Sequence, residues 1–184
     1  MRGRDKLLEV VEGQPLLRRQ AAMAAEVGPV FVALPEHGAD RLLVLDGLPV
    51  TPLPMPEAAE GQSGTLRAGV AALPPCPAFF ILLADLPEIG AADLHALLKA
   101  RQDHPDCTIW RGATPEGKPG HPILFDAALR PRFAELAGDD GGAPLVRREA
   151  QRTHLHRYAD DRARLDLDTP EDWADWRARR EGGR

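Results

Sequence analysis

The stretch PAFFILLADLPEIG, residues 77–90, decides the fold of this chain. Its first half is an apolar run without the alternation that marks a strand with one solvated face, so we expect a strand over 78–84 that is buried on both faces. Such strands belong to parallel sheets with helices on both sides. Ligands bind beyond the carboxyl ends of these strands, and Asp85 lies at that position. The alternative is that Asp85 forms a turn or caps the helix after Pro87.

Helix-like and strand-like segments alternate on both sides of this run. We expect helices over 12–28, 63–73, 91–102, 127–136, 143–151 and from Pro170, and strands over 29–34, 49–53, 107–110, 121–125 and 153–158. This alternation predicts an α/β fold in which a mostly parallel sheet is layered with helices. The chain has no repeat, low-complexity tract or linker, so we expect one domain over 1–178 and a flexible tail over 179–184.

Composition narrows the class of protein. The chain has 184 residues, enough to bury one core, and its formal net charge of -5 argues against binding of nucleic acid. No segment approaches the roughly 18 apolar residues that a membrane span needs, so we expect a cytoplasmic protein without a membrane partner. Cys76 and Cys107 lie far apart without a CxxC pattern, which favours reduced thiols.

A second carboxylate of interest lies in RLDLDTPEDW, residues 164–173. Two leucines alternate with Asp166 and Asp168, so the leucines take one face and the carboxylates the other. Thr169 then fits the N-cap of a helix, with proline at the first position and acidic residues in the first turn, where they offset the helix dipole. Glu171 and Asp172, the acidic residues of that first turn, are explained by this role at the helix start. Asp168 precedes the cap and is not needed for it, so it is the functional candidate.

Four motifs, ILLADLP, EGQSGTLRAG, GHPILF and LDLDTPEDW, resemble in order and spacing the molybdenum cofactor nucleotidyltransferases, and most closely their cytidylyltransferase branch. The resemblance extends from Asp5 to Trp176. Its paired Asp motifs specify a reaction class, whereas GHP and AGDDGG are narrower and indicate the branch. It implies a Rossmann-like three-layer fold and transfer of a nucleoside monophosphate from CTP, or alternatively GTP, to the terminal phosphate of molybdopterin.

The resemblance also assigns roles to residues. Asp85 and Asp168 would hold Mg²⁺, which in proteins takes one or two carboxylates together with waters and substrate phosphates. Lys6 matches the family's lysine after its glycine-rich loop and would neutralise nucleotide phosphates; a lone lysine near a terminus is otherwise a solvated surface charge. The other residues assigned to the nucleotide are Arg4, Gly61, Ser63, Gly64 and Thr65, and those assigned to the acceptor are Gly120, His121, Pro122 and Asp139.

Three of these assigned segments also have a purely structural interpretation. Without the resemblance, residues 61–65 form an ordinary loop that ends in a Ser cap of the following helix. His121 could equally be a structural or surface histidine. The GDDGG stretch at 138–142 is first of all a turn former.

The start of the chain departs from the family pattern. Relatives begin with a strand and a loop like LAAGxSxRMG, whose backbone N–H groups cradle the triphosphate. This sequence opens at MRGRDK, within what would be the end of that loop. We therefore expect the usual first strand to be missing, with open strand edges and a gap in the core. Either translation begins upstream or a genuine short form exists, and the intact remaining motifs favour the first.

Two other functions remain open at this stage. One is transfer to a different phosphorylated acceptor. The other is a protein without catalysis that binds the cofactor and carries it, like a chaperone, to a molybdenum hydroxylase. Release of pyrophosphate from CTP or GTP in the presence of magnesium and molybdopterin distinguishes the enzyme from the carrier.

Overall fold

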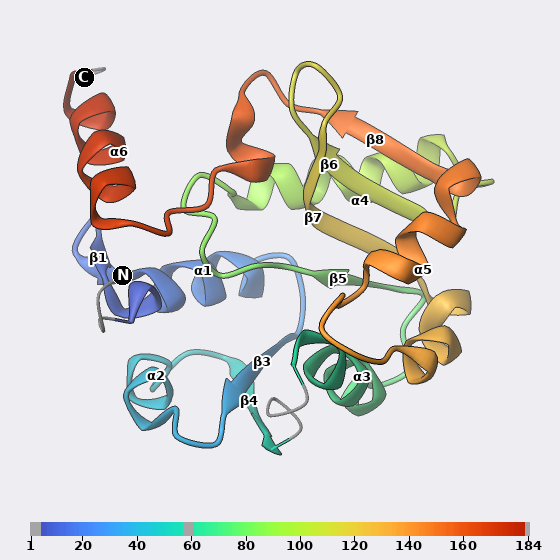
Figure 1. Ribbon diagram of the computed structural model, residues 1–184, viewed down its shortest axis with the longest axis horizontal. Coiled ribbons are helices and arrows are strands. Elements are labelled where there is room, and N and C mark those ends of the chain that lie inside the picture. The colour runs from blue at the N-terminus through green and yellow to red at the C-terminus, as the bar shows by residue number, and fades with distance from the viewer. Residues whose placement is uncertain (1–4, 57–60, 183–184) are drawn as a thin grey trace.

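The computed structural model describes residues 5–56 and 61–182, and Figure 1 shows their arrangement. The main sheet has the strand order β5 (Ala78–Ile81), β7 (Pro119–Asp126), β6 (Ile109–Ala113) and β8 (Thr153–Arg157). β6 and β8 are parallel, and β7 is antiparallel to both β5 and β6, so three of the four strands run the same way. β7 opposes the rest because the short turn 114–118 joins it to β6, and only antiparallel neighbours can be joined so tightly. The α/β fold expected from the sequence is confirmed.

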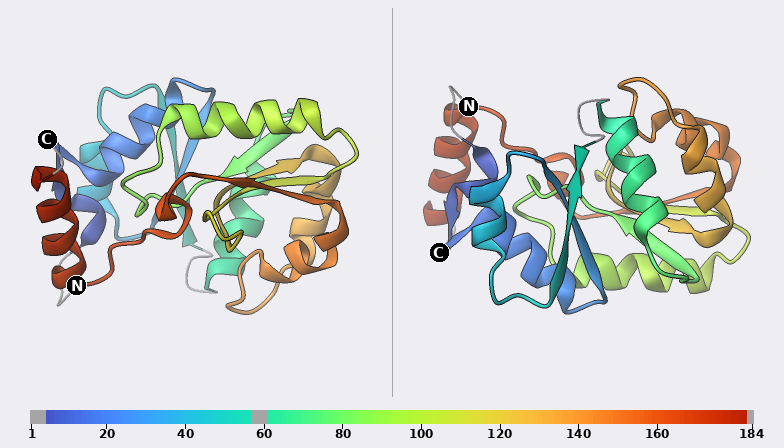
Figure 2. Two further views of the ribbon diagram at one scale, coloured as in Figure 1. Left: turned by 90° about the horizontal axis from the view of Figure 1, so that it is seen from above. Right: turned by 90° about the horizontal axis from the view of Figure 1, so that it is seen from below.

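Helices cover both faces of this sheet (Figure 2), which gives the expected three layers. On one face lies α4 (Ala91–Asp103), and on the other lie α3 (Gln62–Ala72), the 3₁₀ helix η3 (Ala127–Glu135) and α5 (Ala143–Arg148). Successive strand residues point to opposite faces. Trp110 and Leu124 therefore pack towards α4, whereas their neighbours Ile109 and Phe125 pack with η3 and α5.

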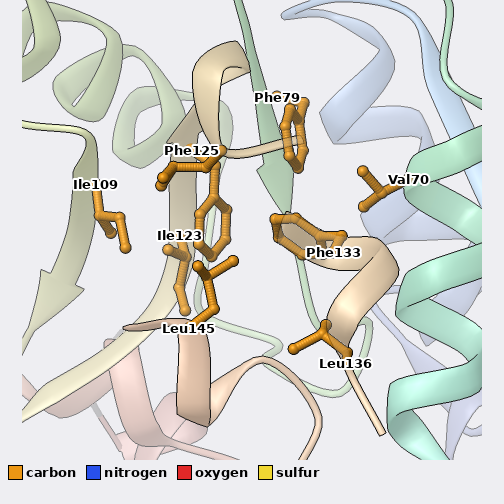
Figure 3. Close-up of a cluster of buried hydrophobic side chains, with 9 residues drawn as sticks. Val70, Phe79, Ile109, Ile123, Phe125, Phe133, Leu136 and Leu145 are labelled. Atoms are coloured by element: carbon orange, nitrogen blue, oxygen red, sulfur yellow. The ribbon is translucent and has the colours of Figure 1, made fainter. Parts of the chain in front are cut away.

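An aromatic cluster forms the centre of the second of these cores. Figure 3 shows Phe133 of η3 reaching between Phe79 of β5 and Phe125 of β7. The ring centroid of Phe133 lies 5.4 Å from that of Phe79 and 5.2 Å from that of Phe125, both in edge-to-face geometry. Aromatic rings favour this arrangement, which fixes η3 against the sheet.

A second, smaller sheet holds two parallel strands, β3 (Val30–Pro35) and β4 (Val50–Met55). Along the chain, α1 (Leu16–Ala25) precedes β3, and α2 (Ala39–Val44) connects β3 to β4. Leu17 and Ala21 of α1 pack against Leu34 and Leu45. Within the described part of the chain β3 pairs only with β4 and β5 only with β7, so the two sheets are not joined by backbone hydrogen bonds.

The two ends of the described chain pack together. The short 3₁₀ helix η1 (Lys6–Leu8) leads into an antiparallel hairpin of β1 (Val10–Val11) and β2 (Gln14–Pro15). The last helix, α6 (Pro170–Gly182), follows the 3₁₀ helices η4 (Ala150–Arg152) and η5 (Asp161–Arg164) and lies beside β1 in Figure 1. Trp173 and Trp176 of α6 are buried against Val11, Leu16 and Leu167. Neither the hairpin nor α2 was expected from the sequence pattern.

Two expectations about elements were wrong. The strand expected over 78–84 ends at Ile81 and is an edge strand, so Phe80 and Ile81 are only half-buried. The helix expected over 127–136 is 3₁₀, and it contains Pro131, which has no backbone N–H to donate.

The tail expected over 179–184 overlaps the last helix. Helix α6 continues through Gly182, so residues 179–182 are helical. Arg180 forms ion pairs with Glu12 and, at 3.3 Å, with Glu88, and its guanidinium lies 5.1 Å from the ring centroid of Trp176. These contacts explain why the helix continues. Among the described residues, no helix is both long enough and apolar enough to cross a membrane.

Candidate functional site

Three residues that are distant in the sequence meet at one point. The Lys6 ammonium lies 2.7 Å from Oδ2 of Asp85 and 2.5 Å from Oδ1 of Asp168. Lys6 comes from η1, Asp85 from the segment after β5, and Asp168 from the residues just before α6. Both carboxylates that the sequence singled out are thus within hydrogen-bonding reach of the same nitrogen atom.

Lys6 is held in place by its neighbour Asp5. The Asp5 carboxylate caps η1 by accepting a hydrogen bond from the backbone N–H of Leu7 at 3.0 Å. It also accepts two from Arg41 of α2, at 2.6 and 3.1 Å. Burial would raise the pKa of Asp5, but the bonds from Arg41 and Leu7 outweigh it and hold this pKa below its usual range. Asp5 therefore stays ionised and fixes the start of η1.

Asp168 is positioned by the cap of α6. Thr169 Oγ1 accepts from the N–H of Asp172 at 3.1 Å, and Asp172 Oδ2 accepts from the N–H of Thr169 at 2.8 Å, a reciprocal capping box. Leu167 is buried, and its carbonyl accepts from the indole N–H of Trp173 at 3.2 Å. With Leu167 inward and the cap formed, Asp168 faces outward towards Lys6, as the alternation of leucine and aspartate predicts.

Charge pairing shifts the pKa values of Lys6 and Asp168. Burial would lower the pKa of Lys6, but its hydrogen bonds to Asp168 and Asp85 outweigh this and raise it above its usual range. The same Lys6 bond lowers the pKa of Asp168. Lys6 and Asp168 are therefore both charged at neutral pH. The side chain of Asp168 is 63% exposed, whereas that of Asp85 is 22% exposed.

The carboxylate pair fits a hard divalent cation, which prefers oxygen ligands, better than a softer metal that prefers His and Cys. Within the described residues, no cluster of three or more His, Cys, Asp or Glu could enclose a metal ion. Mg²⁺ needs no such cage, because it is commonly held by one or two carboxylates and completed by water and phosphate oxygens. Oδ1 of Asp85 is buried and has no hydrogen-bond partner among the described residues, so it is an acceptor still available to a cation.

His121 lies close enough to both Asp85 and Arg111 to be affected by their charges. Burial, followed by the charge of Arg111, lowers the pKa of His121 to about 4, opposed by a hydrogen bond to the backbone of Ile81 and by the charge of Asp85. His121 is thus neutral at pH 7. Its Nδ1 is buried without a partner in the described chain. Arg111 donates two hydrogen bonds to the carbonyl of Gly120, at 3.0 and 2.8 Å, which fixes the backbone beside His121.

Gly120 and Pro122 serve the fold of β7. A Cβ on Gly120 would overlap the carbonyl group of Ala163 in η5, so only glycine permits this close approach. Pro122 is buried and is joined to His121 by a cis peptide bond. Of the three GHP residues that we assigned to the acceptor, His121 alone has a side chain that lines a cavity.

The segment expected to bind nucleotide packs on the 137–142 loop. Gly61 has φ of +83°, and a Cβ there would overlap the carboxylate of Asp139. The buried hydroxyl of Ser63 donates to the carbonyls of Ala137 and Gly141, at 3.3 and 3.5 Å. Gly64 is buried as well. Ser63 therefore ties α3 to this loop from within the helix, and it is not the N-cap that the structural alternative expected, because Gly61 takes that position.

Thr65 lies one step further along α3. It lines the same cavity of about 1040 Å³ as His121, and its hydroxyl donates to the carbonyl of Gly61 at 3.5 Å. Arg4, expected beside Lys6, lies outside the described residues. Sequence reasoning missed Arg41 and Arg111, which also line the cavity. No motif marks either one, and their importance comes only from contacts with Asp5 and with the backbone next to His121.

A family model described as the MobA-like NTP transferase domain matches residues 1–155. No curated protein matches the chain. Among solved structures, Rv0371c from Mycobacterium tuberculosis H37Rv is 21% identical with a TM-score of 0.77, over 95% of this chain and 89% of that one. Its complex with manganese is 22% identical with a TM-score of 0.72, over 94% and 91% of the chains.

Two other solved structures are similar. An Rv0371c homologue from Mycobacterium sp. strain JC1 is 27% identical with a TM-score of 0.77, covering 96% of this chain and 88% of that one. The synthetase of CMP:2-keto-3-deoxy-manno-octonic acid, complexed with CTP, is 14% identical with a TM-score of 0.75, covering 97% and 92%. The family model spans most of the chain, and the chain therefore belongs to the MobA-like NTP transferase domain family and is a nucleotidyltransferase.

Proposed function

We propose that this protein transfers CMP from CTP to the terminal phosphate of molybdopterin and releases pyrophosphate, with Mg²⁺ held by Asp85 and Asp168. The observation that carries the proposal is the convergence of these two carboxylates on Lys6, at 2.7 and 2.5 Å. A reaction between two phosphate-bearing molecules needs concentrated positive charge, and here the Lys6 ammonium meets two carboxylates, one of which, Asp85, has a buried oxygen without a partner in the described chain.

The residues of the chain have separable tasks. Asp85 and Asp168 supply oxygen ligands from two elements, so they also join the segment after β5 to the start of α6. A divalent cation held there would neutralise the phosphate charge that develops as the acceptor attacks the α-phosphorus and pyrophosphate departs. Lys6, fixed at its base by Asp5 and Arg41, would then donate to a phosphate oxygen of the nucleotide. His121 is neutral at pH 7, so its imidazole can donate or accept a hydrogen bond with a substrate without adding charge to the site.

Similar proteins support the metal and the nucleotide. Rv0371c has been crystallised with manganese, which takes the same hard oxygen ligands as magnesium. The CMP:2-keto-3-deoxy-manno-octonic acid synthetase was solved with CTP. Molybdopterin as acceptor rests on the resemblance of the GHP and AGDDGG motifs to the cytidylyltransferase branch. The same resemblance makes a molybdenum hydroxylase the recipient of the product, and GTP the alternative nucleotide.

The test is release of pyrophosphate by the full chain. The protein is incubated with molybdopterin, Mg²⁺ and either CTP or GTP, and pyrophosphate is measured with a coupled enzyme. We expect release that depends on molybdopterin and is faster with CTP. Faster release with GTP would reassign the nucleotide, and release only with another phosphorylated acceptor would reassign the acceptor. No release with any pair, together with tight binding of molybdopterin, would favour the cofactor carrier and reject the enzyme.

A further inference from the structure

Helix α6 is connected to both proposed metal ligands. Asp168 lies just before the first turn of α6, and Asp85 lies in the segment after β5. About three helical turns further along α6, roughly 16 Å away, Arg180 forms an ion pair with Glu88, which belongs to the same segment as Asp85. One end of α6 therefore carries one proposed ligand, and the other end holds the segment that carries the second.

Two side chains of α6 hold Glu88. Its Oε1 accepts a hydrogen bond from the indole N–H of Trp176 at 2.6 Å and forms an ion pair with Arg180 at 3.3 Å. Trp176 is buried in the cluster that packs α6 against the hairpin, so its indole is a rigid anchor. Next to Glu88 in the chain, Ile89 is also buried, and its backbone N–H donates to the carbonyl of Leu86 at 3.3 Å. The segment after β5 is therefore fixed to α6 at Glu88.

A second carboxylate holds Arg180 in turn. Nη1 of Arg180 donates to Glu88, and its Nη2 donates to Oε1 of Glu12, which lies between β1 and β2. Oε2 of Glu12 accepts from Arg19 of α1 at 3.3 Å, and Arg19 also donates to the carbonyl of Pro87 at 2.6 Å. These contacts form a closed ring through α6, the hairpin, α1 and the segment after β5.

The geometry of this contact suits an arginine. The guanidinium of Arg180 lies 5.1 Å from the ring centroid of Trp176, so the buried ring supports it from one side. Its planar fork donates to two carboxylates in fixed directions, which a flexible ammonium does not do. The side chains of Arg180, Glu88 and Glu12 are 33%, 32% and 43% exposed, so these ion pairs add little to global stability. Their effect is on the relative positions of the segments that they join.

The proposed metal site depends on those positions. Asp85 and Asp168 are distant in the sequence, so the separation of their carboxylates is set by how α6 packs against the segment after β5. Mg²⁺ demands nearly ideal octahedral geometry with oxygen ligands at about 2.0–2.1 Å. A displacement on the order of 1 Å can already impair a catalytic arrangement. A contact that fixes this packing therefore acts on the site from a distance.

We propose that Arg180 is a positioning residue for the candidate site. By pairing with Glu88 and Glu12 at once, it holds the segment after β5 against α6. Asp85 and Asp168 then stay close enough to share one divalent cation. The inference rests on the proposed function, because these two aspartates are its proposed metal ligands. Arg180 acts through the two glutamates and not through contact with substrate or metal.

Mn²⁺ affinity tests this role. Lys6 bonds to both carboxylates, so every chain in the comparison carries Lys6→Met, which removes its competition with the metal. Arg180→Met removes the guanidinium, and Arg179→Met is the matched control, because Arg179 is exposed in the same helical turn and its loss changes the net charge equally. Loss of a positive charge alone strengthens the binding of a cation, whereas loss of positioning weakens it. We expect Arg180→Met to weaken Mn²⁺ binding at least threefold, and Arg179→Met to leave it unchanged or slightly tighter.

A double variant tests whether Arg180 acts through Glu88. Glu88→Gln removes the charge that pairs with Arg180 but keeps an oxygen that can accept from the indole of Trp176. If the two residues act as a unit, the substitution of Glu88 should matter less once Arg180 is gone. We expect Glu88→Gln to weaken Mn²⁺ binding at least threefold when Arg180 is present, and less than twofold when Arg180→Met is present.

Amide hydrogen exchange follows the same contact without any metal, in chains that retain Lys6. The reporter is the amide of Ile89, which donates to Leu86 within the segment that Glu88 holds. We expect Arg180→Met to speed the exchange of this amide at least threefold and to leave the amides of β6 and β7 unchanged. A general loss of stability would instead speed exchange in the main sheet as well.

Three results would overturn the proposal. They are Mn²⁺ binding by Arg180→Met as tight as that of Arg179→Met, additive effects of the substitutions at 180 and 88, and an Ile89 amide that exchanges no faster than in wild type. Failure of the proposed function would look different, because the Lys6→Met chain would then bind no Mn²⁺ at all. In that case the exchange of the Ile89 amide decides for or against the role of Arg180: local acceleration supports it, and unchanged exchange rejects it.

Discussion

Lys6 holds the place between Asp85 and Asp168 that a divalent cation would take, so its removal should change metal affinity and turnover in opposite directions. Lys6→Met keeps the aliphatic stem and removes the charge. In the unmodified chain a cation must displace the ammonium from both carboxylates, whereas in the variant it meets the two carboxylates without that competing charge. We expect Lys6→Met to bind Mn²⁺ more tightly and yet to release pyrophosphate more slowly.

The size of the effect follows from the exposure of the two ion pairs. The side chains of Lys6 and Asp85 are 27% and 22% exposed, so their pair lies at the upper end of the range for surface ion pairs, about 1 kcal/mol. The side chain of Asp168 is 63% exposed, and solvent screens its pair to a few tenths of a kcal/mol. Loss of both gives about 1–2 kcal/mol, or roughly 5- to 30-fold tighter Mn²⁺ binding. Loss of a charge that contacts phosphate should lower turnover about 100-fold.

Mn²⁺ binding is measured by electron paramagnetic resonance of the free ion during titration of the full chain without nucleotide. Lys99→Met is the matched control, since Lys99 pairs with Asp103 on an exposed helix face and its loss changes the net charge equally. The control should change the Mn²⁺ dissociation constant by less than about twofold. Equal or weaker Mn²⁺ binding by Lys6→Met would refute the competition between lysine and metal.

Three further predictions concern stability, each measured by chemical denaturation without divalent cations. Because burial lowers the pKa of His121 from 6.5 to about 4, the unfolded chain takes up a proton on acidification before the folded chain does, so the free energy of unfolding should fall by about 3 kcal/mol between pH 7 and pH 4 through this residue. His121→Gln should remove that part of the pH dependence, and His95→Gln on the exposed face of α4 should not. Gly120→Ala should cost about 2–3 kcal/mol, because its Cβ would overlap backbone of η5, whereas Gly28→Ala, with open space around it, should not destabilise. Thr169→Ala should cost about 1 kcal/mol through loss of the α6 cap.

Specific outcomes would contradict these three. The buried, neutral state of His121 is wrong if wild type and His121→Gln lose stability in parallel on acidification. The close approach of β7 to η5 is wrong if alanine at position 120 is tolerated as well as alanine at position 28. A Thr169→Ala variant as stable as wild type would mean that the capping box contributes nothing to α6.

The sequence singled out the two carboxylates by position: local structure does not need Asp168, whereas for Asp85 a turn or cap role stayed an alternative. Asp168 precedes a cap that Thr169 and Asp172 complete by themselves, and Asp85 follows an apolar run at the edge where ligands bind. The two carboxylates come together because of the fold: Asp85 follows a strand of the sheet and Asp168 precedes the last helix. Hydrophobic periodicity and the positions of Gly and Pro were sufficient to predict most helices and strands.

The parts that sequence could not supply depend on distant contacts. The pairing of Arg41 with Asp5, which fixes Lys6, joins α2 to the start of the described chain. No residue pattern in the α2 sequence ADRLLV predicts this pairing. Ser63 reads as a cap exposed to ligand, but the 137–142 loop covers it. The apolar run before Asp85 predicts a strand that is fully buried, yet in the described chain β5 is an edge strand. Whether a strand has a neighbour on its second edge depends on distant parts of the chain, which the strand's own residues do not reveal.

The central claim is that Asp85 and Asp168 together hold one divalent cation. The most direct measurement is Mn²⁺ titration of wild type, Asp85→Asn, Asp168→Asn and the double variant, with the exposed Asp106→Asn as a control of equal charge change. We expect at least tenfold weaker binding for each single variant, a double variant little weaker than either, and an unchanged control. Mn²⁺ binding that survives either single substitution at full strength would contradict it.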